Sequence, residues 1–481
     1  MNAEKPFIHL FRTPGGYYVY DVNTNVILKI EKEDYKYLSE QQKDTIQSKN
    51  SVKNSWVEEV KGRGFLSSKK IKEIIHPSND LLEYYLNNKV KMITLQVTQQ
   101  CNLRCEYCAY SGNYLNRSHM NARMTFEAAR KSIDFIIKRS RNVESINIGF
   151  YGGEPLLEFD LMKKCINYAK EEAEGKNVTF SFTTNGTLFT KEILDFLNAN
   201  DVVITISLDG PKEIHDKSRK FAVSGCGTFE KVSKNLNFFK NNYPEYFKKV
   251  AFNVVLDNKN DFGCVNDFFT AYDVIGDSLI MSSEIEQNYL KSIVEPSEDY
   301  YIKVNYEKFK LFLSKLKKLN GKHVSKLIES DYNKLKTRML DERISTKGLP
   351  EKAHHGGPCV PGTQRLFADI HGNLYPCEKA SENSEIMRIG HIDTGFNIEK
   401  VRTLLNIGEL TAKRCIDCWA FRFCSLCAVS ADDGTKLSAS KKNSNCKGVR
   451  EDTERQFRDY CTLKEFGCSF ENEDVNFLVE V

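Results

Sequence analysis

Three closely spaced cysteines are the residues of this chain whose types and spacing most clearly point to chemistry. Cys101, Cys105 and Cys108 form a C-x3-C-x2-C pattern. Three thiolates can hold three irons of a [4Fe–4S] cluster and leave the fourth iron without a protein ligand. An open metal position is typical of a reactive centre, whereas a structural site closes its shell. The alternative is a zinc site whose fourth ligand lies elsewhere in the chain.

A second group of cysteines lies near the end of the chain, namely Cys359, Cys377, Cys415, Cys418, Cys424, Cys427 and Cys446. Seven thiols exceed one four-coordinate site and nearly fill two. A single zinc-ribbon-like site of Cys415, Cys418, Cys424 and Cys427 is the alternative, and it would leave the other three cysteines without a role.

The elements that must position the first motif lie between about residues 90 and 290. Apolar runs alternate there with helical periods, which predicts strands at 93–98, 145–150, 178–182, 202–208, 250–255 and 278–281. Six βα units favour a parallel sheet with right-handed crossovers. Because a closed barrel has eight strands, we expect a partial α/β barrel that is open on one side and accommodates a large substrate such as a peptide.

Polar motifs follow four of these strands, at the carboxyl-terminal rim where barrel enzymes place their chemistry. The cysteine loop follows the first strand, Gly152-Gly153-Glu154 the second, Asn185 the third, and Ser207 closes the fourth. Each motif alone reads as an ordinary turn. Their coincidence on one rim favours a shared site.

These motifs, together with residues 207–219, resemble those of the radical S-adenosylmethionine (SAM) enzymes. The resemblance implies that SAM binds the open iron. It implies that Gly152, Gly153 and Glu154 meet its amino group, that Ser207 meets the ribose or methionine part, and that Arg219 pairs with its carboxylate. Further contacts would come from Asn185, and from Tyr107 or Tyr110 near the adenine.

The carboxyl-terminal cysteines resemble the SPASM extension of radical SAM peptide maturases, which carries two auxiliary [4Fe–4S] clusters. The resemblance assigns Cys415, Cys418, Cys424 and Cys446 to one cluster, and Cys359, Cys377 and Cys427 to the other. Residues 360–366 contain no cysteine, which implies an open iron that could bind a substrate thiolate, as in thioether-forming maturases. Cys461, Cys468, His354 or His355 could supply the missing ligand instead. Glu378 occupies the place of an acidic base in sulfatase-maturing relatives, although an ordinary loop carboxylate is the favoured role.

The amino-terminal residues predict strands at 7–11, 17–22 and 26–30, followed by helices at about 33–47 and 52–63. This order suggests a small winged-helix-like unit. It resembles the precursor-recognition domain of peptide-modifying enzymes, in which a leader peptide adds a strand to a sheet edge. The alternative is a structural cap on the catalytic domain.

Length and charge limit the remaining possibilities. The 481 residues exceed one domain, and we expect boundaries of 1–85 for recognition, 86–290 for the core, 291–353 for a helical bridge and 354–481 for SPASM. A net charge of +4 without a basic stripe argues against a nucleic-acid partner. No signal peptide or bilayer-length apolar run is recognisable, so we expect no membrane association and a cytoplasmic location. In such a compartment the 15 cysteines suggest metal ligands.

The sequence therefore predicts a radical SAM peptide maturase with three [4Fe–4S] clusters and SAM as cofactors. Its expected product is a thioether, made through a 5′-deoxyadenosyl radical in a cysteine-rich ribosomal precursor peptide that carries a leader. A flavodoxin or ferredoxin is the implied reductant. The alternatives are a carbon–carbon crosslink and a formylglycine in a sulfatase. From another class, the alternative is a non-catalytic iron–sulfur or zinc scaffold that binds peptides.

Overall fold

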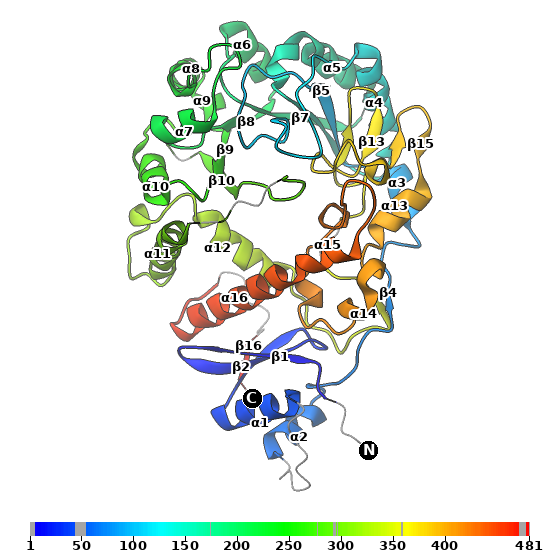
Figure 1. Cartoon of the computed structure of the whole chain (residues 1–481), viewed down its shortest axis with the longest axis vertical. Coiled ribbons are helices and arrows are strands. Elements are labelled where there is room, and N and C mark those ends of the chain that lie inside the picture. The colour runs from blue at the N-terminus through cyan, green and yellow to red at the C-terminus, as the bar shows by residue number, and fades with distance from the viewer. Residues whose placement is uncertain are drawn as a thin grey trace.

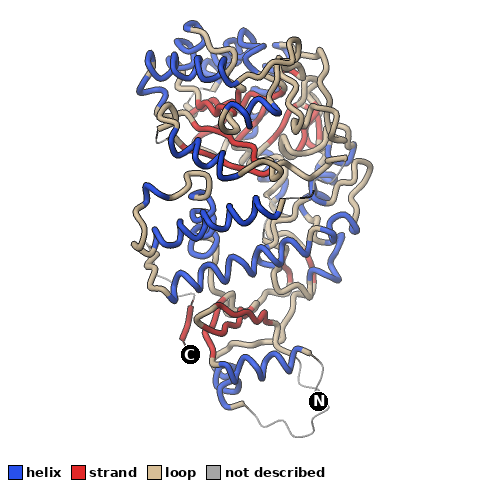
Figure 2. The backbone as a smooth tube through the Cα atoms, turned by 60° about the vertical axis from the view of Figure 1, so that its left-hand side comes forward, coloured by secondary structure: helices blue, strands red, loops and turns tan. Residues whose placement is uncertain are grey.

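The computed structural model describes residues 5–43, 54–173, 175–276, 278–291, 295, 297–356, 359–470 and 478–480. Residues 44–47 and 52–53 of the two helices expected near the amino terminus lie outside the described residues. A small amino-terminal module lies at one end of the molecule and a strand-rich barrel at the other, with long helices between them (Figures 1 and 2).

The amino-terminal module contains an antiparallel sheet whose strands are β1 (Ile8–Thr13), β2 (Gly16–Asp21) and β3 (Val26–Ile30). Helices α1 (Lys32–Gln42) and α2 (Ser55–Gly62) follow and pack on one face of this sheet through a small apolar core of their own. The Asn54 side chain accepts a hydrogen bond from the Val57 amide at 3.0 Å and so caps α2. A short strand from the end of the chain, β16 (Leu478–Glu480), pairs in parallel with β3.

The central segment forms the expected parallel strands, in the spatial order β10-β9-β8-β7-β6-β5. They are β5 (Met92–Thr98), β6 (Ser145–Gly152), β7 (Asn177–Thr184), β8 (Val203–Ser207), β9 (Ala251–Leu256) and β10 (Leu279–Glu284). The helices in and before this segment are α3 (Leu82–Asn88), α4 (Phe126–Arg139), α5 (Phe159–Glu172), α6 (Lys191–Ala199), α7 (Lys212–Ser218), α8 (Phe229–Asn242), α9 (Pro244–Phe247) and α10 (Phe262–Ala271). The strand positions and the parallel α/β class agree with the sequence pattern.

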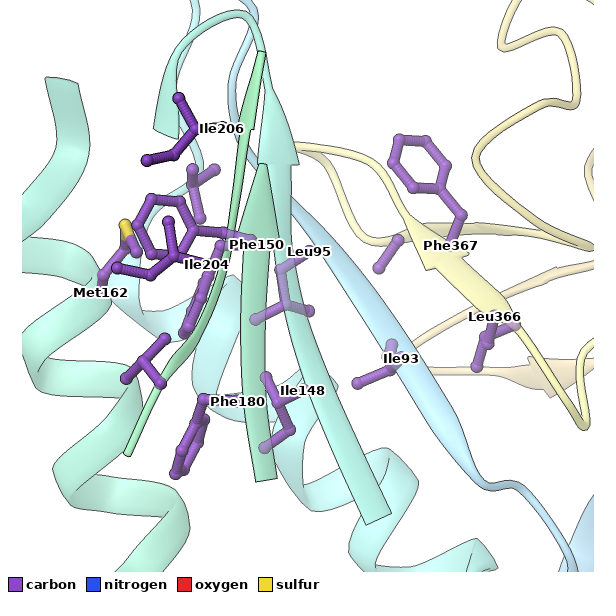
Figure 3. Close-up of a cluster of buried hydrophobic side chains, with 14 of the residues drawn as sticks. Ile93, Leu95, Ile148, Phe150, Met162, Phe180, Ile204, Ile206, Leu366 and Phe367 are labelled. Atoms are coloured by element: carbon purple, nitrogen blue, oxygen red, sulfur yellow. The ribbon is translucent and has the colours of Figure 1, made fainter. Parts of the chain in front are cut away.

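The sheet continues beyond β5 into the carboxyl-terminal part of the chain, which the sequence did not indicate. Strand β12 (Leu366–Ala368) pairs in parallel with β5, and Leu366 lies opposite Ile93. Figure 3 shows Leu366 and Phe367 beside Ile93 on the neighbouring strand. Three short antiparallel strands then extend the sheet: β13 (Asn373–Tyr375), β14 (Gly390–His391) and β15 (Gly395–Phe396). The residues that carry the later cysteines are therefore attached directly to the barrel.

Helices connect the two ends of the molecule. They are α11 (Glu298–Lys315), α12 (Glu329–Lys336), α13 (Ile398–Leu405), α14 (Ala412–Cys415), α15 (Ala439–Ser444) and α16 (Cys446–Glu465). Lys308 of α11 forms an ion pair with Asp459 of α16. On α16, Phe457 contacts the rings of Phe11 and Tyr20 in the amino-terminal sheet. Short strands β4 (Glu73–Ile74) and β11 (Lys352–Ala353) pair with one another. Among the described residues, no helix is long and apolar enough to cross a bilayer.

Candidate iron–sulfur and cofactor site

The first three cysteines lie on the loop after β5, as expected. Burial raises the pKa of the Cys101 thiol and of the Cys105 thiol to about 12 each, Cys105 and Cys108 raise the pKa of Cys101 further, and Cys108 raises that of Cys105. The Leu103 amide donates to Cys101 Sγ at 3.3 Å, and the Tyr110 amide donates to Cys108 Sγ at 3.5 Å. Backbone donors aimed at sulfur stabilise a thiolate, so the loop fits a group that binds thiolates.

Gly152, the last residue of β6, and Gly153 are both required by the chain's own backbone. A Cβ atom on Gly152 would lie 1.9 Å from the Thr98 carbonyl oxygen, and one on Gly153 would lie 2.1 Å from the Gln100 carbonyl oxygen. Gly152 also has a φ of +144°, which disfavours any other residue. The Gly153 amide donates to the Thr98 carbonyl at 3.0 Å. The glycines thus hold the end of β6 against the start of the cysteine loop.

Glu154 is almost completely buried and ties two strand ends together. Its carboxylate accepts hydrogen bonds from the Asn185 amide at 2.8 Å, from the Thr184 hydroxyl at 2.8 Å and from the Leu156 amide at 3.1 Å. Burial raises the pKa of this carboxyl to about 7. The resemblance implies that Glu154 contacts SAM, whereas in the structure both of its oxygens serve the ends of β6 and β7.

Asn185 connects the end of β7 to the cysteine loop. Its Nδ2 donates to Asn102 Oδ1 at 2.8 Å and lies 3.9 Å from Cys101 Sγ. Ser207 is buried at the end of β8. Thus the motifs that follow four different strands meet at one rim, as the sequence predicts.

Arg219 and Asp209 form a buried ion pair next to this rim. Arg219 Nε lies 2.8 Å from Asp209 Oδ2, and Nη2 lies 3.1 Å from Oδ1. The Tyr107 hydroxyl donates to the same carboxylate, and its ring stands 5.5 Å from the guanidinium. The structure therefore gives Arg219 a protein carboxylate as partner, where the resemblance implies the carboxylate of a ligand. Sequence reasoning assigned no role to Asp209, although an acid ten residues before the arginine was visible.

Tyr110 belongs to a buried polar network that sequence reasoning missed. Gln96 Nε2 donates to the Tyr110 hydroxyl and to Glu382 Oε1, both at 2.8 Å. Arg117 forms a buried ion pair with Glu382 and donates to the Ala380 carbonyl at 3.1 Å. Glu382 lies in the carboxyl-terminal part of the chain. The network therefore joins the barrel to the segment that carries Cys377.

Four of the later cysteines, Cys415, Cys418, Cys424 and Cys446, line one pocket. His355, Arg414, Lys442 and Arg450 line the same pocket. Burial raises the pKa of the Cys424 thiol to about 11, and the Cys415 and Cys418 sulfurs raise it further. The structure thus brings together the four residues that the SPASM resemblance groups, and it places Cys427 outside this pocket.

The remaining three, Cys359, Cys377 and Cys427, form a second group. Burial raises the pKa of the Cys377 thiol to about 11, and the nearby Glu378 and Cys427 raise it further. Cys427 likewise raises the pKa of Cys359. Glu378 is paired with Arg365, so a protein cation already engages its carboxylate.

The four side chains considered as an extra ligand for this group lie elsewhere. Cys461 and Cys468 are buried in the core beneath the amino-terminal sheet. His354 Nε2 accepts from the Gly408 amide at 2.8 Å, and His355 lines the four-cysteine pocket. Among the described residues, no group of three His, Cys, Asp or Glu side chains is positioned to hold a single metal ion.

Tyr151 at the end of β6 is linked through Arg117 to the loop that carries Cys377, because Arg117 Nη1 lies 3.5 Å from the Tyr151 hydroxyl and Nη2 donates to the Ala380 carbonyl. Burial raises the pKa of its phenol to about 12, and the charges of Cys108 and Glu378 both contribute. The cysteine loop of the barrel and the loop that carries Cys377 therefore face a common region.

Comparison with known proteins identifies the central segment. Residues 95–263 match the family model of the radical SAM superfamily. The chain is 28% identical over 302 residues to a cysteine-type anaerobic sulfatase-maturating enzyme of Clostridium novyi, an alignment that covers 60% of this chain and 73% of the relative. It is 28% identical over 274 residues to the radical SAM cyclopropyl synthase TigE of Paramaledivibacter caminithermalis, covering 52% of this chain and 56% of that relative.

A solved structure shares the fold. Native anSMEcpe with bound AdoMet superposes with a TM-score of 0.58 at 22% identity, covering 78% of this chain and 99% of that chain. This similarity extends beyond the residues that the family model matches. It agrees with the continuous sheet that joins the barrel to the carboxyl-terminal strands.

Proposed function

We propose that this chain, which carries a radical SAM domain, modifies a ribosomally made precursor peptide by forming thioether bonds from cysteine sulfur to peptide carbon. The superfamily implies one [4Fe–4S] cluster and SAM. Cys101, Cys105 and Cys108 would hold that cluster, and the two amide-to-sulfur hydrogen bonds on their loop suit it. When bound, the cluster and SAM supply a 5′-deoxyadenosyl radical that takes a hydrogen atom from the substrate.

The observation that carries the proposal is the contact of the barrel rim with the loop that carries Cys377, made by Arg117 through the Tyr151 hydroxyl, the Ala380 carbonyl and Glu382. A peptide held there would contact the barrel rim on one side and the Cys377 loop on the other. Cys359, Cys377 and Cys427 provide three thiols for an auxiliary cluster, and the alternative ligands lie elsewhere. Three protein ligands leave one iron for a substrate thiolate, which favours carbon–sulfur bond formation.

The amino-terminal module supports a role in holding the precursor. Strand β3 lies at the edge of its three-stranded sheet, and β16 pairs with that edge from Leu478↔Ile27 to Glu480↔Lys29. The edge is thus able to accept an extended strand, as leader binding by strand addition requires. A cysteine-rich precursor with a leader is the proposed partner, and a flavodoxin or ferredoxin the proposed reductant.

Sulfatase maturation is the second candidate, because four relatives carry that name, three of the cysteine type and one of the serine type. The two reactions differ in what the substrate loses. A thioether forms with loss of two hydrogen atoms and retention of sulfur, whereas conversion of cysteine to formylglycine removes the sulfur.

Mass spectrometry therefore tests the proposal. Anaerobically reconstituted protein with SAM and a reductant is given a cysteine-rich precursor encoded beside its gene and, separately, a sulfatase peptide. We expect hydrogen loss with retained sulfur in the precursor only. The Cys101→Ala variant should abolish it, whereas Cys264→Ser, which changes an exposed thiol on α10, should not. Sulfur loss from the sulfatase peptide would support the second candidate, and a carbon–carbon crosslink would leave the precursor's thiols free to alkylation.

A further inference from the structure

We propose that Lys442 is a positioning residue that raises the reduction potential of an iron–sulfur cluster held by Cys415, Cys418, Cys424 and Cys446. The inference rests on the proposed function, because that function supplies the reason to expect a cluster in this pocket. It does not depend on which peptide is modified. It follows from a buried positive charge whose surroundings lack a matching negative charge.

Lys442 lies on α15 and is only 1% exposed. Its Nζ donates to the Thr411 hydroxyl at 2.8 Å and lies 3.8 Å from Cys415 Sγ. The Thr411 hydroxyl is in turn 3.2 Å from the same sulfur. Within the described part of the chain, no carboxylate pairs with Lys442, in contrast to Lys308 and Lys310 on α11.

A buried ammonium without an anion is strongly unfavourable, so such groups are paired or hydrogen-bonded to a negative partner. The pocket that Lys442 lines contains four thiols, which carry negative charge when they bind metal. Lys442 therefore fits a pocket that is occupied by an anionic metal–thiolate group. Its contact with Cys415 places the charge next to one of the ligands.

The effect of this charge differs between a redox centre and a structural ion. Four thiolates around zinc keep a constant charge, because zinc has no redox chemistry. An iron–sulfur cluster gains one negative charge when it is reduced, and a nearby buried cation stabilises the reduced form. Solvent screens the other cations more, because Arg414 is exposed and Arg450 is half-buried. Lys442 thus makes this cluster a better electron acceptor than it would be without the buried charge.

Thioether formation needs such an acceptor. One C–H and one S–H bond break and one C–S bond forms. The hydrogen atom from carbon leaves with the deoxyadenosyl radical, the thiol proton goes to solvent, and one electron remains. An iron–sulfur cluster of raised potential is the class of oxidant that removes it.

A redox titration followed by electron paramagnetic resonance tests the inference on the full reconstituted chain. The signal lost in Cys446→Ser marks this pocket. We expect Lys442→Met to lower the reduced-to-oxidised ratio at a fixed potential about tenfold or more, which is a shift of ~59 mV for one electron. Lys447→Met is the matched control, because this lysine is next to Cys446 in sequence but its side chain is 80% exposed. Equal midpoints for Lys442→Met and wild type would overturn the inference, as would zinc in place of iron in this pocket.

Thermal unfolding gives a second readout if the Lys442→Met protein fails to assemble the cluster. In metal-free protein the buried charge has no anion, so Lys442→Met should unfold at the same or a higher temperature than wild type. In loaded protein the variant should unfold at a lower temperature. Equal destabilisation in both states would contradict charge compensation. A shifted potential with an unmodified peptide would instead overturn the proposed reaction and leave this inference standing.

Discussion

Arg219 and Asp209 form a bidentate ion pair that is buried at the carboxyl end of β8. Asp209 Oδ1 also accepts from the Val255 amide on β9 at 3.1 Å, and the Tyr107 hydroxyl donates to Oδ2. The pair therefore connects two barrel strands to the loop of the first three cysteines. A ligand carboxylate that approached Arg219 would meet a guanidinium whose position is already fixed by Asp209.

Removal of either partner should destabilise the fold strongly, because it leaves a buried charge without compensation. We expect Asp209→Ala and Arg219→Ala each to lower the free energy of unfolding by about 3–5 kcal/mol. The double variant should lose clearly less than the sum, since neither charge then remains. Urea unfolding of the four proteins measures this coupling, and additive losses would contradict it.

Gly152→Ala and Gly153→Ala should displace the cysteine loop, because each new Cβ would overlap a backbone carbonyl oxygen. We expect a loss of roughly 3 kcal/mol or more in unfolding free energy, together with weaker iron binding by the loop. Gly448→Ala is the matched control, since a Cβ at this position of α16 meets nothing within 4 Å. That change should be neutral or stabilise by up to about 1 kcal/mol. If the three variants had the same unfolding free energy and the same iron content, Gly152 and Gly153 would not be needed to position the cysteine loop.

His215 should make the barrel sensitive to acid. It is fully buried, accepts from the Asp209 amide at 3.3 Å and contacts the Thr228 hydroxyl at 3.0 Å. Burial, helped by Arg219, lowers its pKa from 6.5 to about 4. The unfolded chain therefore binds a proton between these pH values while the folded chain does not. The contribution of neutral His215 to the free energy of unfolding is therefore complete above pH 6.5. It falls by roughly 3 kcal/mol as pH decreases to about 4.

Urea unfolding of metal-free protein at several pH values measures this slope. We expect His215→Gln to be less stable than wild type at pH 7 and to lose less stability between pH 6.5 and 4. If both proteins show the same slope in this window, His215 is not the responsible group.

Strand β16 occupies the edge of β3 that the proposed leader would use. Only one strand can pair with that edge, so the chain's own segment competes with the precursor. Removal of residues 478–481 should tighten leader binding severalfold in fluorescence anisotropy, because the competing strand is gone. Substitution of Val479 by Pro should act in the same direction, since proline removes one backbone donor. Unchanged affinity in both would place the leader elsewhere.

The sequence predicted the barrel well because its strands are apolar runs with local signals. Local signals mark the helices as well: Thr125 precedes α4, and its hydroxyl accepts from the Ala128 amide at 3.2 Å and so caps that helix. The pairing of β12 with β5 was not predictable. Three residues, Leu366–Ala368, carry too little periodicity, and their partner lies more than 270 positions earlier. Long-range pairing of short strands leaves almost no local trace in a sequence.

In the candidate site, too, features with a local sequence signal were predictable and features that depend on long-range packing were not. The resemblance to the SPASM extension indicated that Cys446 joins Cys415, Cys418 and Cys424, as the pocket lining shows, whereas spacing alone favoured Cys427 as the fourth member. Partners that depend on three-dimensional packing were missed: Glu382 meets Arg117 across 265 residues, and Lys442 reaches Cys415 from another helix. The hydrogen bonds of Glu154 to the end of β7 were also missed, since its burial was not apparent from a Gly-Gly-Glu-Pro turn. Side-chain environments of this kind arise only once the chain has folded.

Iron and sulfide analysis with Mössbauer spectra tests the central claim most directly. Anaerobically reconstituted wild type is compared with the Cys101/Cys105/Cys108→Ala variant. Three clusters predict about twelve irons per chain, falling to about eight when the first cysteine group is removed. About four irons with stoichiometric zinc, or an unchanged iron content in the variant, would contradict a radical SAM maturase with two auxiliary clusters.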